Sequence, residues 1–119
     1  MKKIYYLATC STCIRILKEL DGLLTEFQLQ DIKTENITPD QIEQMRTLSG
    51  SYESLFSRRA MKYKSLGLGN KDLSEDDYKN YILEEYTFLK RPVFIIGDEI
   101  FIGNSSKIVE AIRSKLTNS

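Results

Sequence analysis

A cysteine pair near the N-terminus is the feature that most constrains this fold. Cys10 and Cys13 follow a β-prone run at residues 3–7 and meet a helical pattern at residues 13–21. The pair is therefore expected on the turn between a first strand and a first helix, with Ser11 or Thr12 as helix caps.

This position gives the pair its predicted chemistry. At a helix start the backbone N–H groups are unpaired and the helix dipole is positive, so the pKa of Cys10 is expected to lie below that of a free cysteine. Cys13 follows about one helical turn later, close enough for a disulfide. We interpret the pair as redox-active, although Cys13 alone could also be a buried packing residue.

Composition excludes several classes of function. Seventeen basic and seventeen acidic residues give no net charge, so neither nucleic acid nor a membrane surface is expected as a direct partner. The chain has two cysteines and no histidine, which leaves too few ligands for a structural zinc site and no histidine base for hydrolysis. We expect no metal ion.

The hydropathy pattern also bears on location. No apolar run approaches the roughly 20 residues of a transmembrane helix, and no secretory signal is recognised after Met1. The expected location is therefore the cytoplasm, where a lone cysteine pair is more often catalytic or sensing than structural.

The two ends of the chain predict complementary halves of one fold. Residues 26–32 partly alternate polar and apolar side chains, so a second strand should follow the first helix in a right-handed βαβ unit. Near the C-terminus, residues 93–96 and 99–102 predict a hairpin, and residues 105–116 an amphipathic helix. This order of elements is that of a thioredoxin-like fold.

A helical stretch separates these halves. Thr38, Pro39 and Gln41 form a capping signature at the start of its first helix. Helices are predicted over residues 39–49, 52–56, 59–66 and 75–86. We expect one α/β domain, residues 1–119, with a helical insertion at approximately residues 37–88.

Three separated motifs resemble those of the arsenate reductase family of ArsC and Spx proteins. They are TCSTC at residues 9–13, FSRRA at residues 56–60 and LKRPV at residues 89–93. The resemblance covers nearly the whole chain. It implies a nucleophilic cysteine, here Cys10, and a cis peptide bond before Pro92.

The resemblance also implies an anion pocket completed by arginines. Arg91 falls on the arginine before the proline. Arg59 best fits the arginine of the helical insertion, and Arg58 is the alternative if the register differs by one residue. No bound cofactor is implied, and glutathione, glutaredoxin or thioredoxin would supply electrons.

The sequence departs from the glutathione-dependent arsenate reductases at two places. Residues 103–105 (GNS) replace a further arginine of those enzymes, which weakens the case for arsenate as the natural substrate. Those enzymes also need only one cysteine in this turn, whereas Spx-type regulators use a Cys-x-x-Cys switch. In having Cys13 the chain resembles the Spx-type regulators, so it lies between the two branches of the family.

Two functional hypotheses result. In the first, the chain is a thiol oxidoreductase in which the Cys10 thiolate attacks a small oxyanion or an oxidised sulfur held by Arg91 and Arg59. Cys13 or an external thiol then resolves the adduct. In the second, it is an Spx-like regulator that contacts RNA polymerase. We rank the regulator lower because no basic partner patch is evident.

Overall fold

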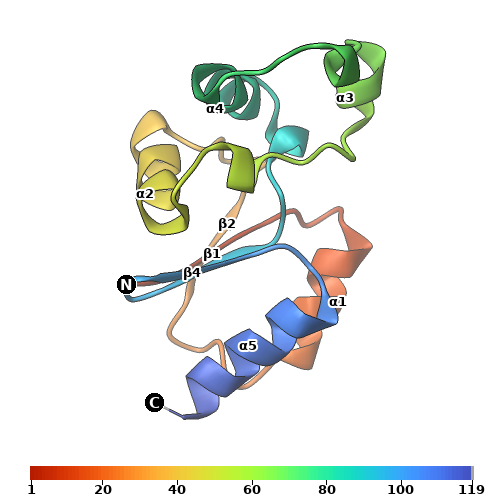
Figure 1. The fold of residues 1–119 in the computed structure, drawn as a ribbon. Coiled ribbons are helices and arrows are strands. Elements are labelled where there is room, and N and C mark those ends of the chain that lie inside the picture. The colour runs from red at the N-terminus through yellow and green to blue at the C-terminus, as the bar shows by residue number, and fades with distance from the viewer. Residues whose placement is uncertain (119) are drawn as a thin grey trace. The chain divides into compact units, whose positions relative to one another are not determined.

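The computed structural model describes residues 1–118 and divides the chain into two compact units. One unit contains Met1–Glu35 together with residues 91–118, and the other contains Asn36–Lys90 (Figure 1). The N-terminal and C-terminal segments thus build one unit together, and the middle of the chain forms the second.

A mixed four-stranded sheet with the order β2-β1-β3-β4 forms the first unit. β1 (Lys2–Tyr6) is parallel to β2 (Gln28–Asp31) and antiparallel to β3 (Val93–Ile96). β3 continues into an antiparallel hairpin with β4 (Glu99–Ile102), through a turn in which Gly97 has a φ of 64°. The predicted thioredoxin-like α/β fold is confirmed.

Two helices pack on one face of this sheet (Figure 1). They are α1 (Ser11–Glu19) and α5 (Ser106–Thr117). Ile4 of β1 pairs with Phe94 of β3, so the two side chains share that face and meet the apolar sides of both helices. The buried cluster consists of Ile4, Ile16, Leu20, Phe27, Phe94, Ile96, Val109 and Ile112.

α1 begins earlier than the hydropathy pattern predicts, and this difference affects the site. Cys10, with φ −93° and ψ 112°, is itself the N-cap. The expectation that Ser11 or Thr12 caps the helix is therefore wrong. Ser11 is the first helical residue, because the carbonyl of Cys10 already accepts the first helical bond, from the N–H of Ile14 at 3.1 Å.

The second unit is helical. It contains α2 (Pro39–Ser49), α3 (Met61–Ser65) and α4 (Glu75–Glu84). Short 3-10 turns connect these helices at Glu53–Leu55, Leu68–Asn70 and Tyr86–Phe88. α4 is shorter than predicted because Glu85 is extended, with φ −140°, and the chain re-enters a helical turn only at Tyr86.

Aromatic packing joins two separated motifs within the second unit. The ring of Phe56 stacks on that of Phe88 with centroids 5.0 Å apart. Alongside, the N–H of Ser57 donates to the carbonyl of Phe88 at 2.7 Å, and the N–H of Lys90 donates to the carbonyl of Leu55 at 2.8 Å. The segment that carries Arg58 and Arg59 is thereby fixed beside the segment that leads to Arg91.

Candidate functional site

Backbone hydrogen bonds fix Cys10 at the start of α1. Its N–H donates to the carbonyl of Leu7 at 2.9 Å, and its own carbonyl accepts the N–H of Ile14. The residue is partly exposed, and its thiol is not in a disulfide. The sulfur is thus held at a helix start and remains accessible.

The surroundings of this sulfur favour its ionised form. Partial burial raises the pKa of Cys10, but several groups act against it, and the net pKa is lowered. These groups are the backbone amide and the thiol of Cys13, the backbone amide of Thr12 and the positive charge of Arg91. Such a cysteine is a better nucleophile at neutral pH than a free thiol of ordinary pKa.

The second sulfur has the opposite character. Cys13 is fully buried, and burial together with the negative charge of Cys10 raises its pKa to about 11. A backbone hydrogen bond from Leu7 and the charge of Arg91 only partly offset this rise. At neutral pH the Cys13 thiol therefore stays protonated and donates a hydrogen bond to the Cys10 sulfur.

The segment before β3 supplies the cation of this site. The charge of Arg91 lowers the pKa of both cysteines, so its guanidinium lies within electrostatic reach of the two sulfurs. The peptide bond between Arg91 and Pro92 is cis. The carbonyl of Pro92 accepts the N–H of Gly103 at 3.0 Å, which ties this segment to the end of β4.

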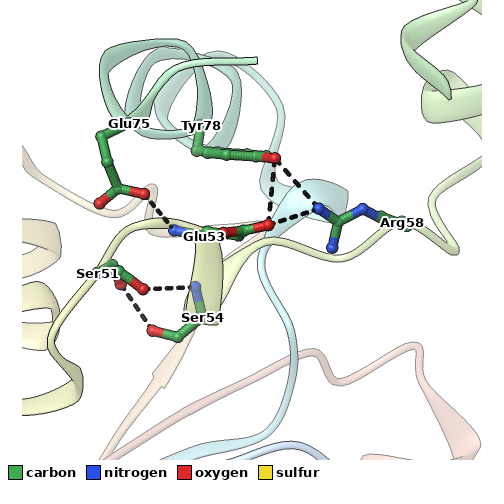
Figure 2. Close-up of polar contacts among 6 residues, drawn as sticks. All are labelled: Ser51, Glu53, Ser54, Arg58, Glu75 and Tyr78. Atoms are coloured by element: carbon green, nitrogen blue, oxygen red, sulfur yellow. Dashed lines mark hydrogen bonds and ion pairs between the residues drawn. The ribbon is translucent and has the colours of Figure 1, made fainter. Parts of the chain in front are cut away.

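The first unit therefore brings together Cys10, Cys13, Arg91 and Pro92, and the other two predicted arginines belong to the second unit. The guanidinium of Arg58 forms hydrogen bonds within the second unit, as Figure 2 shows. Its Nη2 donates to Oε2 of Glu53 at 2.9 Å and to the hydroxyl of Tyr78 at 3.1 Å. The hydrogen bond to Glu53 is the main reason that the pKa of Arg58 is raised.

Glu53, the partner of Arg58, is itself held in place. The carboxylate of Glu75 accepts the N–H of Glu53 at 3.1 Å (Figure 2). It also accepts the N–H of Tyr52 at 2.7 Å. The Oγ of Ser51 accepts the N–H of Ser54 at 3.1 Å in the same turn. Arg58 is thus a structural link between this turn and α4.

Arg59 differs from its neighbour. Its residue is exposed, and its backbone N–H donates to Oγ of Ser57 at 3.3 Å. Within residues 1–118 its guanidinium forms no ion pair. Of the two adjacent arginines, Arg59 is the one whose charge is open to a ligand.

The segment after β4 carries no cation. Gly103 has a φ of 105°, which favours glycine, and Ser105 is the N-cap of α5, where its Oγ accepts the N–H of Ile108 at 3.2 Å. These residues serve the local turn and the helix start. This segment itself therefore offers an anion only backbone and hydroxyl groups and no guanidinium.

The sequence analysis did not predict a groove along the exposed side of α1, lined by Thr9, Ser11, Arg15 and Lys18 among others. The spacing of positions 11, 15 and 18 along one helical side was the available signal. Residues 1–118 contain no cluster of three or more metal-ligating side chains and no helix of the length and hydrophobicity required to cross a membrane.

Comparisons with known proteins bear on the fold and on the family of the chain. A possible arsenate reductase from Streptococcus mutans UA159 is 28% identical, with a TM-score of 0.76 over 95% of this chain and 98% of that one. The protein SACOL0876 from Staphylococcus aureus COL is 27% identical, with a TM-score of 0.75 over 93% and 97%. An arsenate reductase from Vibrio cholerae shares the fold at 17% identity, with a TM-score of 0.77 over 95% of each chain.

No curated protein matches the chain. The model of the ArsC family matches residues 5–112, a range that includes the cysteine pair, both insert arginines and Arg91. The chain therefore belongs to the ArsC family.

Proposed function

We propose that this chain is a thiol-disulfide oxidoreductase of ArsC type, with the Cys10 thiolate as nucleophile. The observation that carries the proposal is the environment of Cys10: a partly exposed sulfur at the start of α1 whose pKa is lowered. Family membership and the arsenate reductases among the structural relatives support the same chemistry.

The first step is a thiol-disulfide exchange. The Cys10 thiolate attacks one sulfur of a disulfide substrate, a bond forms between the two sulfurs, and the substrate S–S bond breaks. The leaving sulfur carries the electron pair away as a thiolate. The charge of Arg91 stabilises negative charge near the reacting sulfurs, as preorganised cations do at other sites of developing charge.

Cys13 is suited to resolve the resulting mixed disulfide. Before the first step its thiol is protonated, in part because the negative charge of Cys10 raises its pKa. Formation of the mixed disulfide removes that charge. The Cys13 proton then leaves more easily, and its thiolate attacks Cys10, which releases the bound thiol and forms the Cys10–Cys13 disulfide. An external thiol, from glutathione, a glutaredoxin or a thioredoxin, then reduces that disulfide or replaces Cys13 in this step.

We propose an oxidised sulfur, in preference to arsenate, as the natural substrate. The segment at residues 103–105 offers no bidentate donor for a tetrahedral oxyanion. Arg91 is the proposed ligand for any negative charge on the substrate, because its charge acts on both sulfurs. The participation of Arg59 stays a prediction of the family resemblance. A reducing compartment such as the cytoplasm suits this chemistry, because it keeps both thiols reduced.

Steady-state turnover tests the proposal. Wild-type protein is assayed with bis(2-hydroxyethyl) disulfide and with arsenate, each in the presence of glutathione. Disulfide turnover is expected to exceed arsenate turnover, to vanish in Cys10→Ser and to persist at a reduced rate in Cys13→Ser. Turnover that is unchanged in Cys10→Ser would overturn the assignment of the nucleophile.

The Spx-like alternative predicts a different outcome of the same experiment. A regulator would form the Cys10–Cys13 disulfide without turnover of either substrate. A pull-down with RNA polymerase, carried out with reduced and with oxidised protein, would then show binding that depends on this disulfide.

A further inference from the structure

A basic segment of the second unit carries two large apolar side chains on its surface. Residues 58–71 contain five lysines and arginines and no acidic residue, although the chain as a whole has no net charge. Met61 is 89% exposed and Leu66 is 49% exposed. Within residues 1–118 the only other exposed large apolar residues are Met1 and Leu29. Apolar side chains exposed together among charged ones are a mark of an interaction surface.

The local structure explains why Met61 faces outward. In α3 only Tyr63 is partly buried, and its ring centroid lies 6.0 Å from that of Phe56. Met61 precedes Tyr63 by two positions, about 200° around a helix of 3.6 residues per turn, so the two side chains lie on opposite sides. Lys64 follows Met61 by three positions and is its neighbour on the outer side. α3 therefore presents a methionine beside a lysine.

The two lysines of α3 differ in their contacts. Nζ of Lys62 lies 3.0 Å from Oε2 of Glu85, and this hydrogen bond is the main reason that the pKa of Glu85 is lowered. Lys64 is exposed and forms no ion pair within residues 1–118. Leu66, the C-cap of α3, lies within about 8 Å of Met61 along the helix axis. We call Met61, Lys64 and Leu66 the α3 patch.

The charge of the α3 patch favours an acidic partner. Lys64 offers an ammonium without a carboxylate partner, in a segment that has no acidic residue of its own. A second copy of this chain fits less well, because the carboxylates of the second unit are largely engaged within it. Those of Glu53, Glu75 and Asp77 already accept hydrogen bonds there.

The apolar members of the patch favour a protein over other anions. Nucleic acid offers phosphates to lysine and would leave Met61 and Leu66 in water. Membrane-surface helices bury a large apolar side, whereas α3 has five residues. A protein segment that carries an apolar side chain next to a carboxylate satisfies both parts of the patch. Methionine is flexible and polarizable, so Met61 can adapt to such a side chain.

We propose that the α3 patch docks an acidic segment of another protein, with a carboxylate on Lys64 and an apolar side chain against Met61 and Leu66. The contact is expected to be sensitive to salt, because Lys64 is exposed. It is independent of the chemistry at Cys10, since no residue of the patch belongs to the proposed catalytic site.

Peptide binding to the full chain tests the proposal. The probe is a fluorescently labelled, amidated peptide of glutamate and leucine, followed by anisotropy. Two control peptides have glutamine in place of glutamate or serine in place of leucine, and both are expected to bind more weakly. Met61→Ser should weaken binding of the probe about tenfold, as for loss of a buried apolar side chain. Lys64→Ala should weaken it about two- to fivefold, as for loss of one exposed ion pair.

Leu29→Ser and Lys33→Ala are the matched controls. They replace an exposed leucine and an exposed lysine of the first unit and are expected to leave the affinity for the probe unchanged. Disulfide turnover and the urea midpoint of Met61→Ser and Lys64→Ala should equal those of the wild type. These two measurements separate a loss of docking from a loss of the fold or of the proposed function.

The opposite outcomes are equally specific. The proposal is overturned if the probe does not bind, if the glutamine peptide binds as well, or if Met61→Ser has no effect. Binding of duplex DNA or of phosphatidylserine vesicles in place of the peptide would assign the patch to another class of ligand. Dimerisation in sedimentation experiments that Lys64→Glu abolishes would assign it to a second copy of the chain. Each of these results leaves the proposed function intact.

Discussion

Two sulfurs three residues apart have opposite properties in this molecule. Cys10 is partly exposed at a helix start and has a lowered pKa, whereas Cys13 is buried and has a pKa raised to about 11. Each state supports the other, because the protonated thiol of Cys13 donates to the Cys10 sulfur and the charge of Cys10 opposes ionisation of Cys13. At the residue scale the pair acts as one nucleophile with its own hydrogen-bond donor.

Alkylation rates measure this difference between the Cys10 and Cys13 thiols directly. In the wild type, the rate of iodoacetamide labelling should follow a titration with a midpoint below the pKa of free cysteine, about 8.5. Cys10→Ser should abolish labelling below about pH 9, because the remaining thiol is buried and protonated. Cys13→Ala should move the midpoint upward, since it removes the thiol donor. A wild-type midpoint at or above that of free cysteine would contradict the proposed nucleophile.

The adjacent arginines of the insertion permit a second comparison. Arg58→Ala should lower the free energy of unfolding by about 0.5–1 kcal/mol, because it breaks the contacts with Glu53 and Tyr78. Arg59→Ala should change that free energy by less than about 0.5 kcal/mol but raise the KM for an anionic disulfide substrate. Urea denaturation and turnover measure the two effects, and an unchanged KM in Arg59→Ala removes this residue from the site.

Arg91 is the remaining charged residue of the proposed site. In Arg91→Ala the pKa of Cys10 should rise, because one of the groups that lower it is lost. The midpoint of the alkylation profile should therefore shift upward in Arg91→Ala, and it should shift further in a double variant that also lacks Cys13. Arg91→Ala should also weaken the binding of an oxyanion inhibitor. Arg91→Lys keeps the charge and should restore most of the shift of the midpoint, while an unshifted profile in Arg91→Ala would contradict an electrostatic role.

At the scale of elements, the predicted cap of α2 is confirmed. The hydroxyl of Thr38 caps this helix in a reciprocal arrangement with the residue three positions later, and Ser74 caps α4 in the same way. The start of α1 was misplaced because its cap is a cysteine, which is not among the preferred capping residues. The departure from the usual rule thus falls on the residue that we propose carries the chemistry.

The α2 cap yields a prediction with an internal control. Thr38 accepts the N–H of Gln41 at 3.1 Å, so Thr38→Ala should lower the free energy of unfolding by about 1 kcal/mol. The hydroxyl of Thr47, exposed on the same helix, only bonds back to the carbonyl of Glu43 at 2.9 Å, a contact that does not stabilise a helix. Thr47→Ala should therefore be neutral or slightly stabilising in the same urea titration, and equal losses in the two variants would contradict the capping argument.

At the scale of the whole molecule, the order of elements was predictable but some burial was not. The βαβ pattern and the hairpin follow from short-range periodicity, so the fold class could be predicted from the sequence. In β2 the alternation of side chains did not identify the buried face: Leu29 is 50% exposed, whereas Gln30 is 1% exposed. The amide of Gln30 donates to the carbonyl of Glu35 at 3.1 Å, and this partner in the loop after the strand satisfies a polar group in a position that periodicity would give to an apolar one.

The whole molecule should also become less stable at alkaline pH because of one buried thiol. The pKa of Cys13 is about 11 in the folded protein and near 8.5 in an unfolded chain, so between these values only the unfolded state has lost the proton. The stability that protonated Cys13 contributes is therefore complete below about pH 8.5 and falls as the pH rises towards about 11. Urea midpoints of the wild type should decline more steeply over this interval than those of Cys13→Ala, under reducing conditions. Tyrosines and lysines titrate in both proteins and cancel in the difference between the two curves. Because Cys13→Ala also changes the pKa of Cys10, the same comparison is repeated in a Cys10→Ser background. Parallel curves in both backgrounds would show that the pKa of Cys13 is not raised by the fold.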